Sequence, residues 1–300
     1  GRRRRGDRLH QVDPRGHGHP HVRPRWWSGG SDDGSEARHG LGRHLARPAS
    51  APATALALAV VAVALGGCSP EGRSSGTGPT RHTVVVLAAS SLTGPLTAMA
   101  RDFEASHPGT DIRVSFAASS TVVAQVNQGA PADLLALAGR AAAAPLDKSR
   151  IVGGAPSLAS NTLEIATPPG NPGNVEAITD LSRPTLKVVL CAATVPCGKA
   201  AAKALSLAGV VAHVVSYEID VKATLAKVQL GEADAAIVYR SDVLSAGGRV
   251  HGVLLPASVN QTLDYPLIRL TQDPTAAEFA SYVLSDQGRK RLRDNGFLTP

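Results

Sequence analysis

Two stretches of the chain repeat one pattern, in which a β-branched strand runs into a small Ala-Ser-Ser turn and then into the start of a helix. They are VVVLAASSLT at 84–93 and VSFAASSTVV at 114–123. Such a turn aims free backbone N–H groups and serine hydroxyls at one point, and the start of a helix attracts negative charge. Capping of the two helices by Ser91 and Ser119 uses the same groups. The doubled turn therefore predicts paired anion-binding turns or two capped helices, and these interpretations are compatible.

The formal charge of +7 belongs mostly to the beginning of the chain. Before Cys68 there are 11 Arg, no Lys and 5 acidic residues, whereas the remainder has 20 basic and 19 acidic residues. Residues 1–42 are rich in Arg, Gly, His and Pro and show no helical or strand periodicity. A basic arm for nucleic acid is one interpretation of them. We instead expect a spurious or unstructured extension, from an over-extended reading frame or a cleaved presequence, and no nucleic-acid partner.

The segment 43–67 has the pattern of a lipoprotein signal peptide. A basic start precedes an apolar run at 55–65, and Leu-Gly-Gly-Cys follows, ending at Cys68. A transmembrane anchor is the alternative, but the run is shorter than the roughly 20 residues that span a bilayer. We therefore expect Cys68 to be lipidated, 68–82 to be a flexible linker, and the rest to lie outside the cytoplasm, anchored to the outer face of the cell membrane.

Two further cysteines, Cys191 and Cys197, lie close together in LCAATVPCGKAAAKAL. In an oxidising compartment, two cysteines in one short loop predict a disulfide. Free thiols, a metal site and a catalytic thiol are the alternatives. A metal site lacks a nearby second pair of ligands in the sequence.

From residue 83 the chain alternates apolar strands with helical patterns, which predicts an α/β fold. We expect two lobes, each a mostly parallel sheet flanked by helices, with a ligand cleft between them. Lobe 1 is expected at 83–165 and 263–300, and lobe 2 at 166–262. The last segment, 276–295, is predicted to be a single terminal helix.

The ordered set of motifs resembles the periplasmic molybdate-binding proteins of bacterial ABC importers. It comprises AASSLTGPLTAMARDFE, FAASST, QGAPAD, VPCGKAAAKAL, GEADAAIVYRSD and DYPLIRL, between about residues 83 and 298. The resemblance implies the two-lobed periplasmic-binding-protein fold of type II. It also implies capture of molybdate or tungstate and its delivery to a membrane permease and ATPase, by a monomer without a cofactor and without enzymatic activity.

In that family a tetrahedral oxyanion lies between the lobes, held by neutral donors. The resemblance assigns hydroxyl and N–H donors to Ser91 and Ser119, backbone N–H donors to Cys197 and Val221, and a hydroxyl to Tyr239. Cysteine at 197 departs from relatives that carry a smaller residue there, but a backbone donor tolerates the change. No metal site is expected apart from the oxyanion itself.

Other functions remain open from the residues alone. Serines at strand-to-helix turns are also typical of hydrolases, but no G-x-S-x-G or H-E-x-x-H motif is present. The second alternative function is a binding protein for a different ligand, which is either another oxyanion such as sulfate or a small organic anion. Without the resemblance, Tyr239 is also explained by strand packing. Asp133 is expected to be structural, because a carboxylate that faces a dianion repels it. Lys222 either adds positive potential at the cleft or is a solvated surface lysine, and we expect the second.

Overall fold

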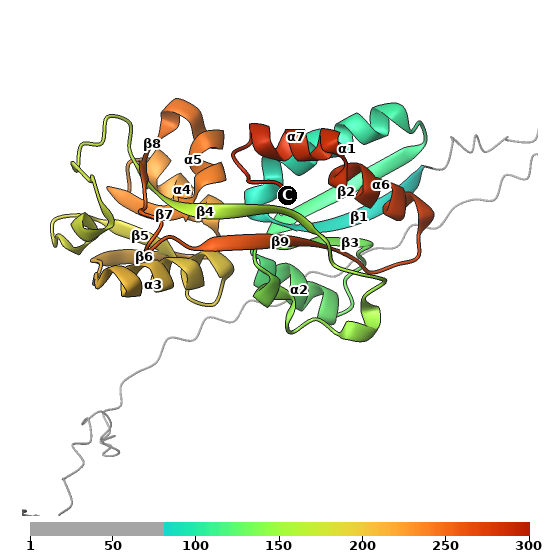
Figure 1. Ribbon diagram of the computed structural model, residues 1–300, viewed down its shortest axis with the longest axis horizontal. Helices are drawn as coiled ribbons and strands as arrows, with labels where there is room; N and C mark the ends of the chain where they lie inside the picture. The colour runs from blue at the N-terminus through green and yellow to red at the C-terminus, as the bar shows by residue number, and fades with distance from the viewer. Residues whose placement is uncertain (1–80) are drawn as a thin grey trace, which may run out of the picture. The chain divides into compact units, whose positions relative to one another are not determined.

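Strands and helices alternate through residues 81–300, which are the residues that the computed structural model describes (Figure 1). The predicted extension, signal peptide and lipidated Cys68 lie outside them, as does the predicted linker except for its last two residues. Those interpretations stay predictions. No helix within 81–300 is long and apolar enough to cross a bilayer.

The first lobe is built on a parallel sheet whose strands are joined by helices. Its elements are β1 (His82–Ala89), η1 (Ser90–Leu92), α1 (Thr93–Ser106), β2 (Thr110–Ala117), α2 (Ser119–Asn127) and β3 (Leu134–Ala136). β1 lies between β2 and β3 and pairs in parallel with both. α1 and α2 lie on opposite sides of these strands (Figure 1). The predicted strand–turn–helix order of both Ala-Ser-Ser stretches is therefore correct.

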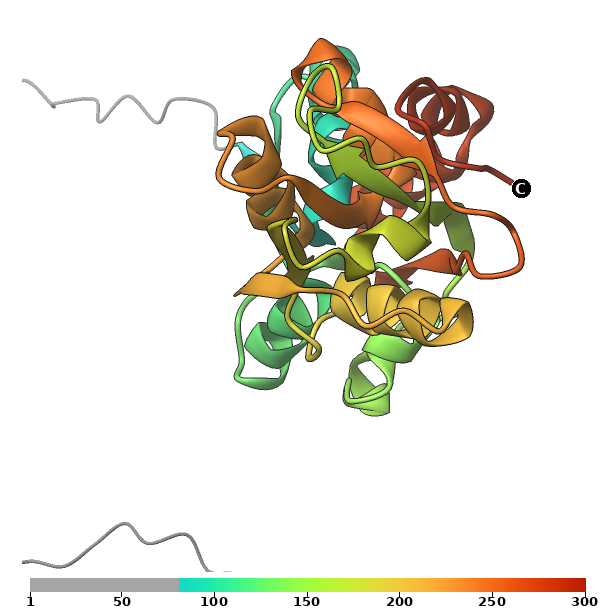
Figure 2. The same ribbon diagram turned by 90° about the vertical axis from the view of Figure 1, so that its left-hand side faces the viewer.

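The second lobe repeats this organisation. It contains β5 (Val188–Cys191), α3 (Pro196–Ala208), β6 (Val214–Glu218), α4 (Val221–Gln229), β7 (Ala235–Tyr239) and α5 (Arg240–Ala246). β5 pairs in parallel with β6 and β7. Both views place α3 on the same side of the sheet as α2 (Figure 1, Figure 2). The sequence pattern had not indicated α5, which is a short helix of seven residues.

Two antiparallel strands carry the chain between the lobes. β4 (Ser157–Thr167) pairs with β9 (Thr262–Arg269) as far as Thr162, and from Leu163 onward it pairs with β7 and β8 (His251–Leu254). β9 continues to β3 of the first lobe, so eight strands form one connected path, and β8 pairs with β4 beside it. β4 has 11 residues, which is long enough to pair with strands of both lobes, and β8 was not predicted. The change of partners falls between Thr162 and Leu163, and the lobe bounds stay a prediction.

The prediction of one terminal helix at 276–295 is wrong. The structure has α6 (Pro274–Leu284) and α7 (Asp286–Asp294), separated by Ser285 in an extended conformation. The Ser285 hydroxyl accepts a hydrogen bond from the N–H of Gly288, 3.3 Å away, and so caps α7. Short 3-10 helices were also unpredicted: η2 (Arg140–Ala143), η3 (Lys148–Arg150), η4 (Ile178–Ser182) and η5 (Gly247–Arg249).

One charged side chain is buried in the second lobe without full compensation. Glu164 on β4 is 6% exposed, and its Oε2 has no hydrogen-bond partner among the described residues. Burial raises the pKa of its carboxyl above the ordinary 4.5, while Arg240 and His251 offset part of this effect. The charged form of Glu164 therefore opposes folding.

We expect Glu164→Gln to raise the free energy of unfolding at pH 7. Because the pKa is raised in the folded state, the native protein gains stability as the pH falls through that raised value toward 4.5. The difference in free energy of unfolding between the variant and the wild type should decrease over the same pH interval. Urea unfolding of both proteins at several pH values measures this. A less stable variant at pH 7 would show instead that attraction to Arg240 outweighs the burial cost.

Candidate functional site

Three long helices begin around one small cavity between the lobes. Ser119 is the first residue of α2, Cys197 the second residue of α3 and Val221 the first residue of α4. N–H groups in the first turn of a helix have no acceptor within the helix, and the helix dipole adds partial positive charge there. The cavity is therefore surrounded by donors that favour a negatively charged group.

The structure brings all five predicted site residues to this cavity. Its free space for the centre of a water-sized sphere is about 10 Å³. The lining consists of Ala89, Ser90, Ser91, Ala117, Ala118, Ser119, Ala138, Pro196, Cys197, Asp220, Val221 and Tyr239. A space of this size holds about one water molecule. That the five residues bind a ligand stays a prediction.

Both predicted serines are held by hydrogen bonds that leave their own protons available. Ser119 Oγ accepts from the N–H of Ala138 at 2.8 Å. Ser91 Oγ lies 3.0 Å from the hydroxyl oxygen of Tyr265, which is 3.5 Å from the amide nitrogen Nδ2 of Asn161. Because Asn161 can only donate through Nδ2, Tyr265 is able to accept there and donate to Ser91. Each serine can then donate its proton into the cavity.

Tyr239 supplies a buried hydroxyl that has no partner within 81–300. The side chain is 2% exposed at the end of β7, and its ring meets that of Tyr265 edge-on at 6.2 Å between centroids. Burial, as the largest cause, raises the pKa of Tyr239 well above the ordinary 10.0. The hydroxyl therefore stays protonated and is a donor to whatever occupies the cavity.

A disulfide joins Cys191, at the end of β5, to Cys197, with a Cα–Cα distance of 5.8 Å. It fixes the first turn of α3 to the strand beside it. Gly198 reinforces this packing, since a Cβ at that position would lie 2.0 Å from the carbonyl oxygen of Ala192. The N–H of Cys197 is consequently held in place before any ligand arrives.

Charged groups near the cavity differ from what the sequence indicated. Lys222 is not a freely solvated lysine: its Nζ lies 2.8 Å from Oδ1 of the fully buried Asp242. Asp133 has the predicted structural role, because its carboxylate accepts from the N–H of Val85 and from the hydroxyl of Thr271, both at 2.8 Å. No Lys or Arg is among the residues that line the cavity.

Sequence reasoning missed several contributors to this site. Asp220 lines the cavity and caps α4, with its Oδ1 accepting from the N–H of Ala223 at 2.9 Å. An Asp directly before a helical pattern is a recognised cap signal, so it could have been found. Tyr265 and Asn161 come from the crossing strands β9 and β4, and no local motif indicates that they approach Ser91.

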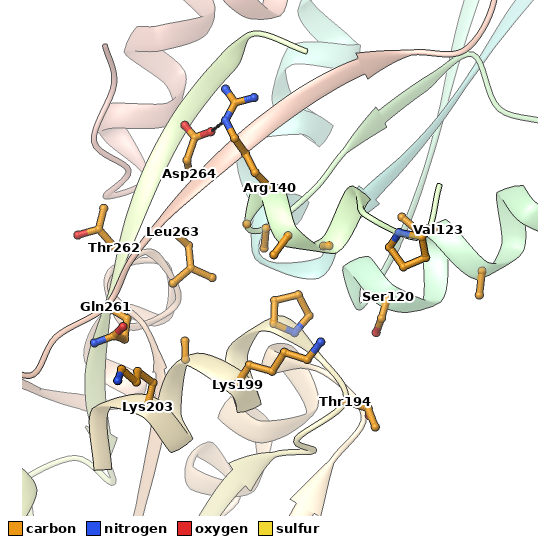
Figure 3. A pocket seen from close by; sticks show the side chains of 18 of the residues that line it. Ser120, Val123, Arg140, Thr194, Lys199, Lys203, Gln261, Thr262, Leu263 and Asp264 are labelled. Atoms are coloured by element: carbon orange, nitrogen blue, oxygen red, sulfur yellow. Dashed lines mark ion pairs between the residues drawn. The ribbon is translucent and has the colours of Figure 1, made fainter. Parts of the chain in front are cut away.

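A larger cavity of about 600 Å³ adjoins the small one, with Ala138 and Pro196 lining both (Figure 3). It lies between α2 and η2 on one side and α3 on the other. Lys199 and Lys203 of α3 line it, and neither has an acidic partner within 4 Å among residues 81–300. Opposite them Arg140 pairs with Asp264 of β9 at 2.5 Å. Positive charge therefore lies in the outer space, while the inner cavity has neutral donors.

Two α/β lobes crossed by two strands, with a small cavity where their helices begin, define a two-lobed solute-binding protein. The model of the bacterial extracellular solute-binding protein family matches residues 84–298. The chain belongs to that family. Members are transport binding proteins, a class distinct from enzymes.

Individual relatives agree with this assignment. The chain is 37% identical over 244 residues to a protein of Mycobacterium tuberculosis named molybdate-binding protein ModA, covering 79% of this chain and 93% of the relative. A Haemophilus influenzae protein of the same name is 29% identical over 227 residues, covering 71% and 89% of the two chains.

Solved structures show the same architecture. The substrate-binding domain of a putative molybdenum ABC transporter from Clostridium difficile is 25% identical, with a TM-score of 0.57 and coverage of 73% of this chain and 99% of that one. The periplasmic molybdate-binding protein of Azotobacter vinelandii, at 19% identity, has a TM-score of 0.64 and covers 72% and 99%. The expected two-lobed fold is confirmed.

Loss of the disulfide should destabilise the protein. We expect Cys191→Ala combined with Cys197→Ala to lower the free energy of unfolding by about 2 kcal/mol, because the closed loop is short. Urea unfolding measures the change, and peptide mapping without reductant should recover Cys191 linked to Cys197. Alkylation of both thiols in the unreduced native protein would contradict the bond.

Proposed function

We propose that this protein captures molybdate or tungstate outside the cytoplasm and delivers it to an ABC importer. The observation that carries the proposal is the small cavity itself, with the starts of α2, α3 and α4 and the unpartnered Tyr239 hydroxyl gathered around it. The printed names of the relatives, molybdate-binding protein ModA, support the same ligand.

Neutral donors are sufficient to hold a dianion in such a site. A hydrogen bond to a charged group contributes about 1.5–3 kcal/mol. Five donors that are already in place therefore supply substantial affinity without a lysine or an arginine. Their N–H and O–H groups lose little freedom on binding, because helix starts, the disulfide and the serine hydrogen bonds fix them beforehand.

Discrimination follows from the same lining. A protonated phosphate needs an acceptor for its own O–H, and Asp220 is the carboxylate in the lining. Its Oδ1 accepts from the N–H of Ala223, which makes this carboxylate the cap of α4, and the donors around the cavity outnumber this one acidic group. We therefore expect a fully ionised oxyanion to bind best, with sulfate separated from molybdate and tungstate mainly by size.

The transport role involves partners beyond this chain. We propose that Cys68 carries a lipid anchor in the membrane, that the folded part acts as a monomer, and that the ligand-closed form docks on a permease driven by an ATPase. Closure would occur by bending of β4 and β9 where they cross between the lobes. The protein needs no cofactor and performs no catalysis in this scheme.

The ligand can be tested by calorimetry of residues 69–300 with molybdate, tungstate, sulfate and phosphate. Molybdate at 100 times its dissociation constant should stabilise the fold by about 2.7 kcal/mol. Sulfate and phosphate should bind far more weakly. No heat and no thermal shift with either molybdate or tungstate would refute the proposal, and preference for sulfate would favour the alternative oxyanion.

Tyr239→Phe tests the buried hydroxyl. We expect molybdate binding to weaken by about 1.5–3 kcal/mol, because one hydrogen bond to the charged ligand is lost. The melting temperature without ligand should stay the same or rise, since the hydroxyl has no partner in the free protein. Tyr282→Phe is the matched control, since its hydroxyl donates to Asp102 on α1. Equal affinity in both variants would exclude Tyr239 from the ligand shell.

A further inference from the structure

An ion pair connects the two helix starts of the second lobe that flank the small cavity. Lys222 Nζ on α4 lies 2.8 Å from Oδ1 of Asp242 on α5. The other carboxylate oxygen of Asp242, Oδ2, accepts from the N–H of Tyr239 at 3.3 Å. Lys222 directly follows Val221, which lines the cavity, and Tyr239 also lines it. The pair therefore ties together the two segments that carry these lining residues.

Asp242 is an unusual neighbour for an anion site. It is fully buried, whereas the side chain of Lys222 remains 34% exposed. Asp220 already contributes one carboxylate to the lining. Asp242 lies behind the lining, where it is bonded to the backbone N–H of Tyr239. The groups that face it are Lys222 from α4, Asp220 at the cap of α4, Tyr239 from β7 and Tyr265 from β9. Among these, Lys222 is the cation.

We propose that Lys222 is a charge-compensating residue of the oxyanion site. Its ion pair with Asp242 neutralises a carboxylate that would otherwise repel the bound dianion. This inference rests on the proposed oxyanion-binding function. It gives Lys222 a role through Asp242, without contact between Lys222 and the ligand.

A merely structural ion pair and a charge-compensating one predict different results for paired variants. If only packing matters, removal of either partner weakens binding, and removal of both weakens it at least as much. If charge matters, Lys222→Met leaves a buried carboxylate beside the dianion, whereas Asp242→Asn leaves a cation there. The double variant then removes both charges and recovers affinity.

The experiment measures molybdate affinity by calorimetry at pH 8 for the wild type, both single variants and the double variant. We expect Lys222→Met to weaken binding about tenfold or more, Asp242→Asn to bind at least as tightly as the wild type, and the double variant to recover most of the loss. Lys227→Met is the control, because this lysine of the same helix pairs with exposed Glu232. Thermal unfolding of each variant checks that it is folded.

The pH dependence separates charge from packing. Burial raises the pKa of Asp242, and Lys222 opposes that effect. In Lys222→Met the carboxyl should therefore take up a proton more readily as the pH falls from 8 to 6. Its repulsion of the anion then fades, and the affinity gap between this variant and the double variant should narrow. The double variant keeps Asp220, so the comparison isolates Asp242.

The possible outcomes are distinct. Wild-type affinity in Lys222→Met, or equally weak and pH-independent binding by Lys222→Met and the double variant, would overturn the inference. If Lys222→Met does not fold, the Asp242→Asn variant is used in its place. A tenfold loss of molybdate affinity in folded Asp242→Asn would also overturn the inference. A wild type that binds none of the four oxyanions refutes the proposed function itself.

Discussion

Desolvated backbone N–H groups at the starts of α2, α3 and α4 are the constraint on which the rest of this structure depends. Such groups are costly to bury without an acceptor, and here three helices aim them at one small space. The parallel strand–helix units place each helix start at the same edge of its sheet. The two lobes then face one another across these edges, so the fold and the anion site follow from one arrangement.

The local part of this arrangement was predictable from the sequence, and the non-local part was not. The Ala-Ser-Ser turns indicated Ser91 and Ser119 because strand, turn and helix signals lie within ten residues of one another. The family resemblance added Cys197, Val221 and Tyr239. By contrast, Tyr265 reaches Ser91 from 174 positions away along the chain. Only the pairing of β9 with β3 and β4 brings it there, and no periodicity encodes that pairing.

The errors have the same physical origin. The terminal helix was predicted as continuous because its apolar spacing continues, yet the hydroxyl of Ser285 caps a new helix there. Lys222 was interpreted as solvated because its sequence neighbours give no hint of Asp242, which is buried on a helix 20 residues later. In both cases the structure depends on one polar side chain, Ser285 or Asp242, whose effect the local sequence pattern does not indicate.

The separation of charge between the two adjoining cavities has a kinetic consequence. Lys199 and Lys203 line the outer space, whereas the lining of the inner one has neutral donors, the Asp220 carboxylate and no lysine or arginine. Long-range attraction accelerates the encounter of an anion with the protein and is screened by salt, whereas short hydrogen bonds in a closed space are screened little. The rate of encounter and the residence time of the ion are therefore set by different residues. Changes in ionic strength alter how often an ion arrives more than how long it stays.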